Sequence, residues 1–197
     1  MIKVKRIIIY IIILMISTLL FGCADIDLKS STVINENESG SVKLQIIYDD
    51  FIYSKLKKDI IDHEWAEKNG YLFNKYLKNN MNIEEITYEF KNIKELEQKI
   101  NSSGLATMTY SKRIRMGENI CTIDLKFNKS AIDNLIKATT NNDEKIYNYI
   151  KNVKFTNKVK VSRNIVKSNA TVDIDENTKE WTYELSQIDD DTAMLLY

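Results

Sequence analysis

Residues 106–127 read ATMTYSKRIRMGENICTIDLKF, and this stretch predicts a β-hairpin. Apolar residues recur at alternate positions on both sides of residues 117–119, Gly-Glu-Asn, which we expect to form the turn. One strand would place its apolar side chains on one face, and the returning strand would do the same. These side chains are Ala106, Met108, Tyr110, Ile114 and Met116, followed by Cys121, Ile123, Leu125 and Phe127.

Similar patterns extend outward from this hairpin and predict the fold class. Alternation of apolar and polar residues predicts strands at 42–46, 86–90, 153–161, 170–174, 181–185 and 193–197. Apolar residues at helical spacing predict helices at 51–70, 71–77, 93–103 and 130–150. Strands with helices inserted between them predict an α+β fold, a mostly antiparallel sheet with helices packed on one face.

The first 22 residues have the organisation of an export signal. Lys3, Lys5 and Arg6 precede an apolar run that ends in Gly22, which is typical of a secretory signal peptide. Because Cys23 follows at once, the segment resembles a bacterial lipoprotein signal. This resemblance implies that residues 1–22 are removed and that Cys23 carries a covalent diacylglyceryl lipid. The alternative is an uncleaved membrane anchor, for which the run is close to the lower length limit.

The rest of the chain divides into a short segment and one domain. Residues 23–40, which begin with the lipidated Cys23, mix Asp, Ser, Asn, Glu and Gly without a sustained period, so we expect a flexible tether. Residues 41–197 have the length of one ordinary domain. Both the lipid anchor and the uncleaved anchor place this domain on the extracytoplasmic face of the cell membrane.

Composition argues against several functional classes. Lys and Arg together number 28 and so do Asp and Glu, whereas a general nucleic-acid binder needs a basic face. Two cysteines exclude a disulfide-rich scaffold, and a single histidine argues against a structural zinc site. The sequence has no P-loop, dinucleotide fingerprint, G-x-S-x-G or Cys-x-x-Cys motif, so we expect no enzyme activity.

One acidic stretch has part of a calcium-loop pattern. Asp173, Asp175 and Asn177 stand at alternate positions, and Glu184 falls where the bidentate ligand of such a loop would stand. However, Thr178 replaces the glycine that the sharp turn needs, and strand patterns flank the stretch. These four residues are therefore weak metal candidates, and we expect a polar hairpin turn without a metal.

The remaining candidate residues have structural explanations as well as functional ones. His63 lies beside Trp65 on an expected helix, and Cys121 lies on the apolar face of an expected strand. Basic strand faces are usually solvated, but they could also bind an anionic headgroup or envelope polymer. Tyrosines usually cover a core, but they could also line a groove for an acyl or aromatic ligand. The basic residues are Lys112, Arg113, Arg115, Lys126, Lys129, Lys154, Lys158 and Lys160, and the tyrosines are Tyr71, Tyr76, Tyr147 and Tyr149.

Residues 159–171, VKVSRNIVKSNAT, followed by Trp181, carry a resemblance to a known family. This stretch resembles the LppM-type domain of bacterial lipoproteins, whose function is largely unassigned. The family pattern there is a strand, a tight turn, Val-x-x-Ser-Asn-Gly/Ala, a second hairpin and a Trp, and this chain has Ile-Val-Lys-Ser-Asn-Ala at residues 165–170. This chain has Ser162-Arg163-Asn164 where the family usually has a Pro-Gly turn. The resemblance implies an extracytoplasmic, membrane-tethered α+β module and supplies no catalytic residue.

These observations favour a membrane-anchored lipoprotein that binds an envelope lipid or polymer without catalysis. An apolar groove between helices and sheet would support this hypothesis. The alternative is a protein-interaction component of an envelope or secretion assembly, which an exposed apolar patch or an open strand edge would favour. A hydrolase is a third hypothesis, and it requires two carboxylates that converge in a cleft.

Overall fold

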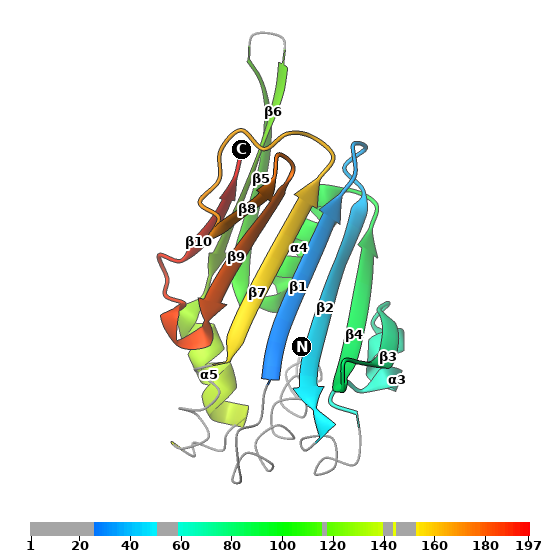
Figure 1. The fold of residues 1–197 in the computed structure, drawn as a ribbon. Coiled ribbons are helices and arrows are strands. Elements are labelled where there is room, and N and C mark those ends of the chain that lie inside the picture. Colours follow the sequence, from blue (N-terminus) through cyan, green and yellow to red (C-terminus); the bar gives the residue numbers. More distant parts are fainter. Residues whose placement is uncertain (1–25, 51–58, 116–117, 140–143, 145–152) are drawn as a thin grey trace.

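The computed structural model describes residues 26–50, 59–115, 118–139, 144 and 153–197 (Figure 1). Seven strands form one sheet in the order β3-β4-β2-β1-β7-β9-β8, and three strands form a second sheet in the order β10-β6-β5. The first sheet contains β1 (Ile26–Ile34), β2 (Gly40–Asp49), β3 (Leu72–Lys78), β4 (Met81–Phe90), β7 (Lys154–Val161), β8 (Val172–Asp175) and β9 (Thr178–Glu184). The second contains β5 (Ala106–Arg115), β6 (Glu118–Phe127) and β10 (Ala193–Leu196).

Three helices accompany these strands: α3 (His63–Lys68), α4 (Ile93–Ser103) and α5 (Lys129–Thr139). A single 3-10 turn, η1 (Leu185–Gln187), follows β9. Every described strand pair is antiparallel except β1 with β7, which is parallel. The predicted α+β class, a mostly antiparallel sheet with helices packed on one face, is therefore confirmed.

The core lies between the larger sheet and the elements packed on it. One group of buried side chains joins β1 and β4 to α4 and β5, and a second joins β7 and β9 to β10. Trp181 of β9 has no exposed surface and lies at the centre of the second group. A third group, near the start of β1, includes Tyr48, Ile60, Ile61 and Ala66. The smaller sheet and α4 thus cover the same side of the larger sheet.

The expected flexible tether at residues 23–40 is wrong for the part that the structure describes. Residues 26–34 form β1, which lies inside the larger sheet with β2 on one side and β7 on the other. Its middle residues are polar, and the sequence pattern therefore lacks a clear alternation. Two hydrogen-bonded ladders stabilise the strand, while Ile26 and Ile34 are buried at its ends. The folded domain therefore includes residues 26–40, which we expected to lie outside it.

The helix predicted at residues 71–77 is also wrong, because these residues form most of β3. The two-residue turn that follows, Asn79 and Asn80, has positive φ angles of 51° and 62°. Asn adopts such angles readily, and two positive φ angles in a row are characteristic of the tight turns that join antiparallel strands. The turn therefore pairs residues 72–78 with β4. Of the helix predicted at 51–70, residues 51–58 lie outside the described residues and only α3 is helical in the remainder.

The hairpin predicted at residues 106–127 is confirmed as β5 and β6, and its tip at 116–117 lies outside the described residues. Tyr110 pairs with Ile123 and Lys112 with Cys121 across the two strands. Figure 1 shows that the hairpin extends beyond the end of the larger sheet. For this reason Ile114, which we expected on the core face, is 75% exposed.

Candidate functional site

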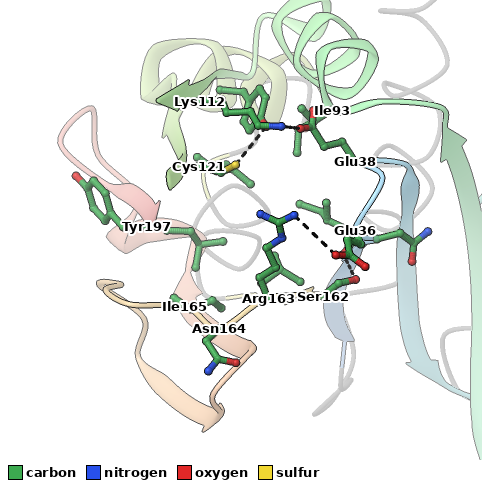
Figure 2. Close-up of a pocket in the computed structure, with 16 residues that line it drawn as sticks. Glu36, Glu38, Ile93, Lys112, Cys121, Ser162, Arg163, Asn164, Ile165 and Tyr197 are labelled. Atoms are coloured by element: carbon green, nitrogen blue, oxygen red, sulfur yellow. Dashed lines mark hydrogen bonds and ion pairs between the residues drawn. The ribbon is translucent and has the colours of Figure 1, made fainter. Parts of the chain in front are cut away.

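A pocket of about 120 Å³ opens where the two sheets and the first turn of α4 meet (Figure 2). It lies at the end of β1 that leads into the β1–β2 turn. Five stretches of sequence contribute to it: the end of β1 with its turn, the start of α4, the β5–β6 hairpin, the end of β7 with the loop that follows, and the end of β10. The lining residues include Ile34, Glu36, Glu38, Ile93, Tyr110, Lys112, Cys121, Ile123, Val161, Arg163, Ile165 and Leu196.

The wall of the pocket is apolar because each contributing element turns a core side chain toward it. Ile34 ends β1 and Val161 ends the neighbouring strand β7, with which it is in parallel register. Ile93 is the first residue of α4 and Ile123 lies on β6. Ser162 fastens the next loop to β1, because its backbone N–H donates to the Ile34 carbonyl at 3.0 Å. Two sheets and a helix thus hold the wall in place.

The mouth of the pocket carries two basic and two acidic side chains. The Lys112 ammonium of β5 donates to the Glu38 carboxylate at 2.8 Å and so joins the smaller sheet to the β1–β2 turn. The Arg163 guanidinium lies 3.8 Å from the Glu36 carboxylate. Figure 2 shows these four side chains among those that line the pocket. The pocket therefore combines an apolar interior with a charged entrance.

Glu38 occupies a backbone conformation that a glutamate rarely adopts. Its φ is 67°, in the left-handed region, where Gly and Asn are favoured. The turn geometry imposes this angle, because the Glu38 N–H donates to the Asn35 carbonyl at 3.0 Å and the Asn35 N–H to the Ser39 carbonyl at 2.8 Å. The strained position directs the Glu38 carboxylate toward Lys112.

The electrostatics of the entrance follow from these contacts. The hydrogen bond from Lys112 lowers the pKa of the Glu38 carboxyl, against a smaller opposing effect of burial, and the Tyr110 hydroxyl lowers it further. Burial raises the pKa of Tyr110, whose hydroxyl donates to the Cys121 sulfur at 3.5 Å. Glu38 is thus held ionised, and Tyr110 is held as a neutral hydrogen-bond donor.

The other reactive side chains singled out in the sequence lie in different surroundings. His63 begins α3, and its imidazole lies 3.1 Å from the Glu67 carboxylate. Cys121 is half-buried with its side chain on the apolar side of β6, as the sequence predicts, and this side forms part of the pocket wall.

Two buried carboxylates are adjacent in sequence and point to opposite faces of the larger sheet. Glu84 is fully buried and accepts hydrogen bonds from the Tyr48 hydroxyl and from the backbone N–H groups of Ile60 and Ile61. Glu85 is paired with Lys43 at 2.9 Å. Successive residues of a strand face opposite sides, so these two carboxylates do not converge in one cleft.

The four weak metal candidates do not come together. Asp173 pairs with Lys179 at 3.2 Å, and the Asp175 carboxylate accepts from the Asn177 backbone N–H at 3.0 Å, as expected in a polar turn. Glu184 lies at the far end of β9, six residues beyond Thr178. Within the described ranges, no group of three or more His, Cys, Asp or Glu side chains could hold a metal ion.

Most of the described basic and tyrosine side chains that the sequence singled out lie beside other residues of the fold and do not line the pocket. Lys154 and Lys158 on β7 are each opposite a glutamate of β9, Glu184 and Glu180, so their strand face has mixed charge. Tyr71 stacks on Trp65 with ring centres 5.4 Å apart, while the Tyr76 hydroxyl accepts from Gln45 at 3.0 Å. Tyr147 and Tyr149 lie outside the described residues, as does Cys23. Of the basic residues singled out in the sequence, Lys112 alone lines the pocket.

Within the ranges that the structure describes, no helix has the length and apolar character needed to cross a membrane. No protein-family model matches the chain, and no curated protein matches it. Among solved structures, the chain is similar to the NMR structure of the folded domain of the Mycobacterium tuberculosis LppM protein. The TM-score is 0.53 at 12% sequence identity, and the match covers 90% of this chain and 92% of that domain. The two proteins share a fold, as the sequence resemblance implies.

Proposed function

We propose that this protein is a non-enzymatic binding module on the extracytoplasmic face of the cell membrane, anchored by a lipid on Cys23. Its pocket would hold part of an envelope lipid or polymer. The observation that carries this proposal is the pocket itself, which joins an apolar wall to a charged mouth. Such a combination is typical of sites that bury the apolar part of a ligand and orient its polar part.

The size of the pocket limits what it can hold. A cavity of about 150 Å³ accommodates one benzene molecule. At about 120 Å³, the pocket could take the end of a lipid chain or a single unit of a polymer. The bound segment would therefore be a small part of a larger envelope molecule, or a small molecule by itself.

The position of Cys23 supports a close attachment to the membrane. Only Ala24 and Asp25 separate it from Ile26, where β1 begins, and three residue steps span at most about 11 Å. From Ile26 to Ile34, β1 runs about 26 Å at ~3.3 Å per residue. The lipid and the pocket would therefore lie at opposite ends of β1. The pocket would therefore face away from the leaflet that holds the lipid anchor, toward ligands in the rest of the envelope.

The proposal is tested by identifying the small molecules that copurify with the protein. The full chain is extracted from bacterial membranes and the copurifying small molecules are identified by mass spectrometry. Ile165→Trp should fill the pocket and remove the bound compound, whereas Val166→Trp, at a neighbouring side chain that is 89% exposed, should retain it. Identical compounds in the wild type and in both variants would overturn the proposal.

An interaction with another protein is a second candidate, and the outer edge of β8 favours it. This four-residue strand ends the larger sheet, with Val172 and Ile174 46% and 44% exposed. Open edges of this kind can pair with an extended segment of a partner. Val172→Lys with Ile174→Lys should then abolish a specific protein crosslink on intact cells without changing the compounds in the pocket. A crosslinking pattern identical to that of the wild type would argue against this role.

A further inference from the structure

We propose that the pocket takes a compact anion with an apolar body, an aryl or short-alkyl carboxylate or phosphate monoester, whose anionic group binds Lys112 where the Glu38 carboxylate now lies. This inference rests on the proposed function and names the ligand class of the same pocket. It assigns Glu38 a specific role, that of an internal carboxylate that competes with the ligand.

The first argument is that an oxyanion already occupies this position. The Glu38 carboxylate accepts from the Lys112 ammonium at 2.8 Å. A charged donor therefore already holds a carboxylate at the mouth of an apolar pocket. Hydrogen bonds between ionised partners are the strong ones, and the Lys112 ammonium can donate in the same way to an anionic group of similar size from a ligand.

The second argument is the backbone of Glu38. A residue at φ 67° in a hairpin turn would usually be Gly or Asn, which adopt the left-handed conformation at lower cost. A glutamate here accepts strain and gains only an ion pair between partly exposed side chains, 46% and 32% for Lys112 and Glu38. Strain of this kind at a pocket entrance is typical of residues with a functional role.

The third argument concerns the sign of the ligand charge. Lys112 projects from β5, which pairs with β6 along its length, whereas Glu36 and Glu38 lie in the short turn between β1 and β2. The Glu36 side chain is 80% exposed and its carboxylate lies as far as 3.8 Å from the Arg163 guanidinium, so this ion pair is loose. An anion can displace the two turn carboxylates and meet two basic groups. A cation would have to displace Lys112 from a strand, and the structure therefore favours an anion.

The fourth argument is size. The whole pocket, with its charged mouth, measures about 120 Å³, which is comparable with the cavity of about 150 Å³ that holds one benzene molecule. A full acyl chain with its headgroup at the mouth would not fit. The ligand is then either a free small acid or the terminal group of an envelope polymer, and both present the same chemistry to the pocket.

The test is a titration of the full chain in nanodiscs of zwitterionic lipid, followed through the methyl NMR signals of Ile34, Ile93 and Ile123. Phenyl phosphate is the anionic probe and benzyl alcohol the neutral control of similar size. We expect phenyl phosphate to bind at least tenfold more tightly. Lys112→Gln should weaken its binding about tenfold, as expected for loss of a charge-assisted hydrogen bond, while Lys112→Arg should largely retain it.

Removing the Glu38 charge should change the affinity for phenyl phosphate in the opposite direction to Lys112→Gln. Glu38→Gln keeps the side-chain size but removes the competing charge, so phenyl phosphate should bind several-fold more tightly, because the binding-competent state is no longer a minor one. Glu36→Gln is the matched control in the same turn and should have a smaller effect. Unchanged or weaker binding to Glu38→Gln would overturn the competing role of this carboxylate.

The outcomes separate this inference from the proposed function. Equal binding of phenyl phosphate and benzyl alcohol, with no effect of Lys112→Gln, would overturn the anionic ligand class. If neither probe binds while Ile165→Trp still removes a copurifying compound, the ligand class is overturned and the proposed function stands. If Ile165→Trp also removes nothing, both are overturned. The mass of the compound released by the wild type distinguishes a free acid from a polymer end group.

Discussion

The indole N–H of Trp181 donates to the side-chain oxygen of Asn169 at 2.9 Å, and through Asn169 it is connected to the smaller sheet. The same oxygen accepts from the backbone N–H of Leu195 at 2.8 Å, and the Asn169 amide nitrogen donates to the Ala193 carbonyl at 2.6 Å. Trp181 belongs to β9 and Leu195 to β10. One asparagine therefore satisfies a fully buried indole and holds the edge strand of the smaller sheet.

We expect Asn169→Ala to lower the free energy of unfolding by about 2 kcal/mol, because it leaves the buried indole N–H of Trp181 without its partner. Asn169→Asp should have a smaller effect, since a carboxylate oxygen can still accept from Trp181. Urea unfolding measures both, with Asn164→Ala as an exposed control that should stay within about 0.5 kcal/mol of the wild type. A loss below 1 kcal/mol for Asn169→Ala would contradict the role assigned to Asn169.

This contact shows what the sequence could predict about the fold. Asn169 and Trp181 are two of the residues that carry the resemblance to the LppM-type domain, and the structure joins them by a hydrogen bond. Strands with clear alternation and the helix that begins after Asn92 were predictable from local pattern alone, and α4 starts there with Asn92 accepting from the Glu95 N–H. β1 was not predictable in this way, because its middle residues are polar and one of its two partners, β7, is more than 100 residues away.

A proline substitution distinguishes the strand from a tether. Ser30 lies in the middle of β1, opposite Leu44 on β2 and Asn157 on β7. Ser30→Pro should lower the free energy of unfolding by about 3 kcal/mol or more, because proline removes a backbone donor from an interior strand. Ser30→Ala is the matched control and should lose less than about 1 kcal/mol. Thermal or urea unfolding of the full chain provides the measurement. An unchanged free energy of unfolding for Ser30→Pro would contradict the strand and favour a flexible tether at this position.

The buried Glu84 should make stability depend on pH. Burial raises the pKa of this carboxyl, and hydrogen bonds from Tyr48, Ile61 and Ile60 oppose the shift in part. The folded state then holds a proton that the unfolded chain loses above its ordinary pKa of 4.5. The Glu84 contribution to the free energy of unfolding is therefore fully present below pH 4.5. It decreases as the pH rises through the raised pKa, and above that pKa it no longer changes with pH.

The measurement is the difference in unfolding free energy between the wild type and Glu84→Gln from pH 4 to pH 8. Glutamine cannot titrate here, so the difference isolates Glu84 from the other acids. We expect the wild type to lose stability relative to the variant as the pH rises. At neutral pH Glu84→Gln should still be destabilised by about 1–3 kcal/mol, because its single oxygen cannot serve all three donors. A difference that is constant with pH would contradict the raised pKa.

The pocket could be predicted only in part. Lys112 and Cys121 were candidates from the sequence, and both line it. Glu38 was missed because it lies in the stretch interpreted as a tether. Arg163 stands in the segment where the chain departs from the family turn pattern, and that departure was the available signal. The remainder depends on which strands pair, because the lining residues come from stretches more than 150 positions apart.

Lipid attachment has a direct chemical test. Cells grown with an alkyne analogue of palmitate should label the wild type, and Cys23→Ala should abolish both the label and the recovery of the protein in the membrane fraction. Cys121→Ala is the control, since it removes the other cysteine of the chain and should leave the label unchanged. Labelling of Cys23→Ala at the wild-type level would contradict the proposed anchor.

The most direct test of the binding role is photocrosslinking in living bacteria. A diazirine-bearing residue of leucine size is placed at Ile165, which lines the pocket, or at the exposed neighbour Val166. After illumination, intact-mass spectrometry should show an adduct of one defined mass at residue 165 and none of that mass at residue 166. The same adducts at both positions, or no adduct at residue 165, would contradict a ligand in this pocket.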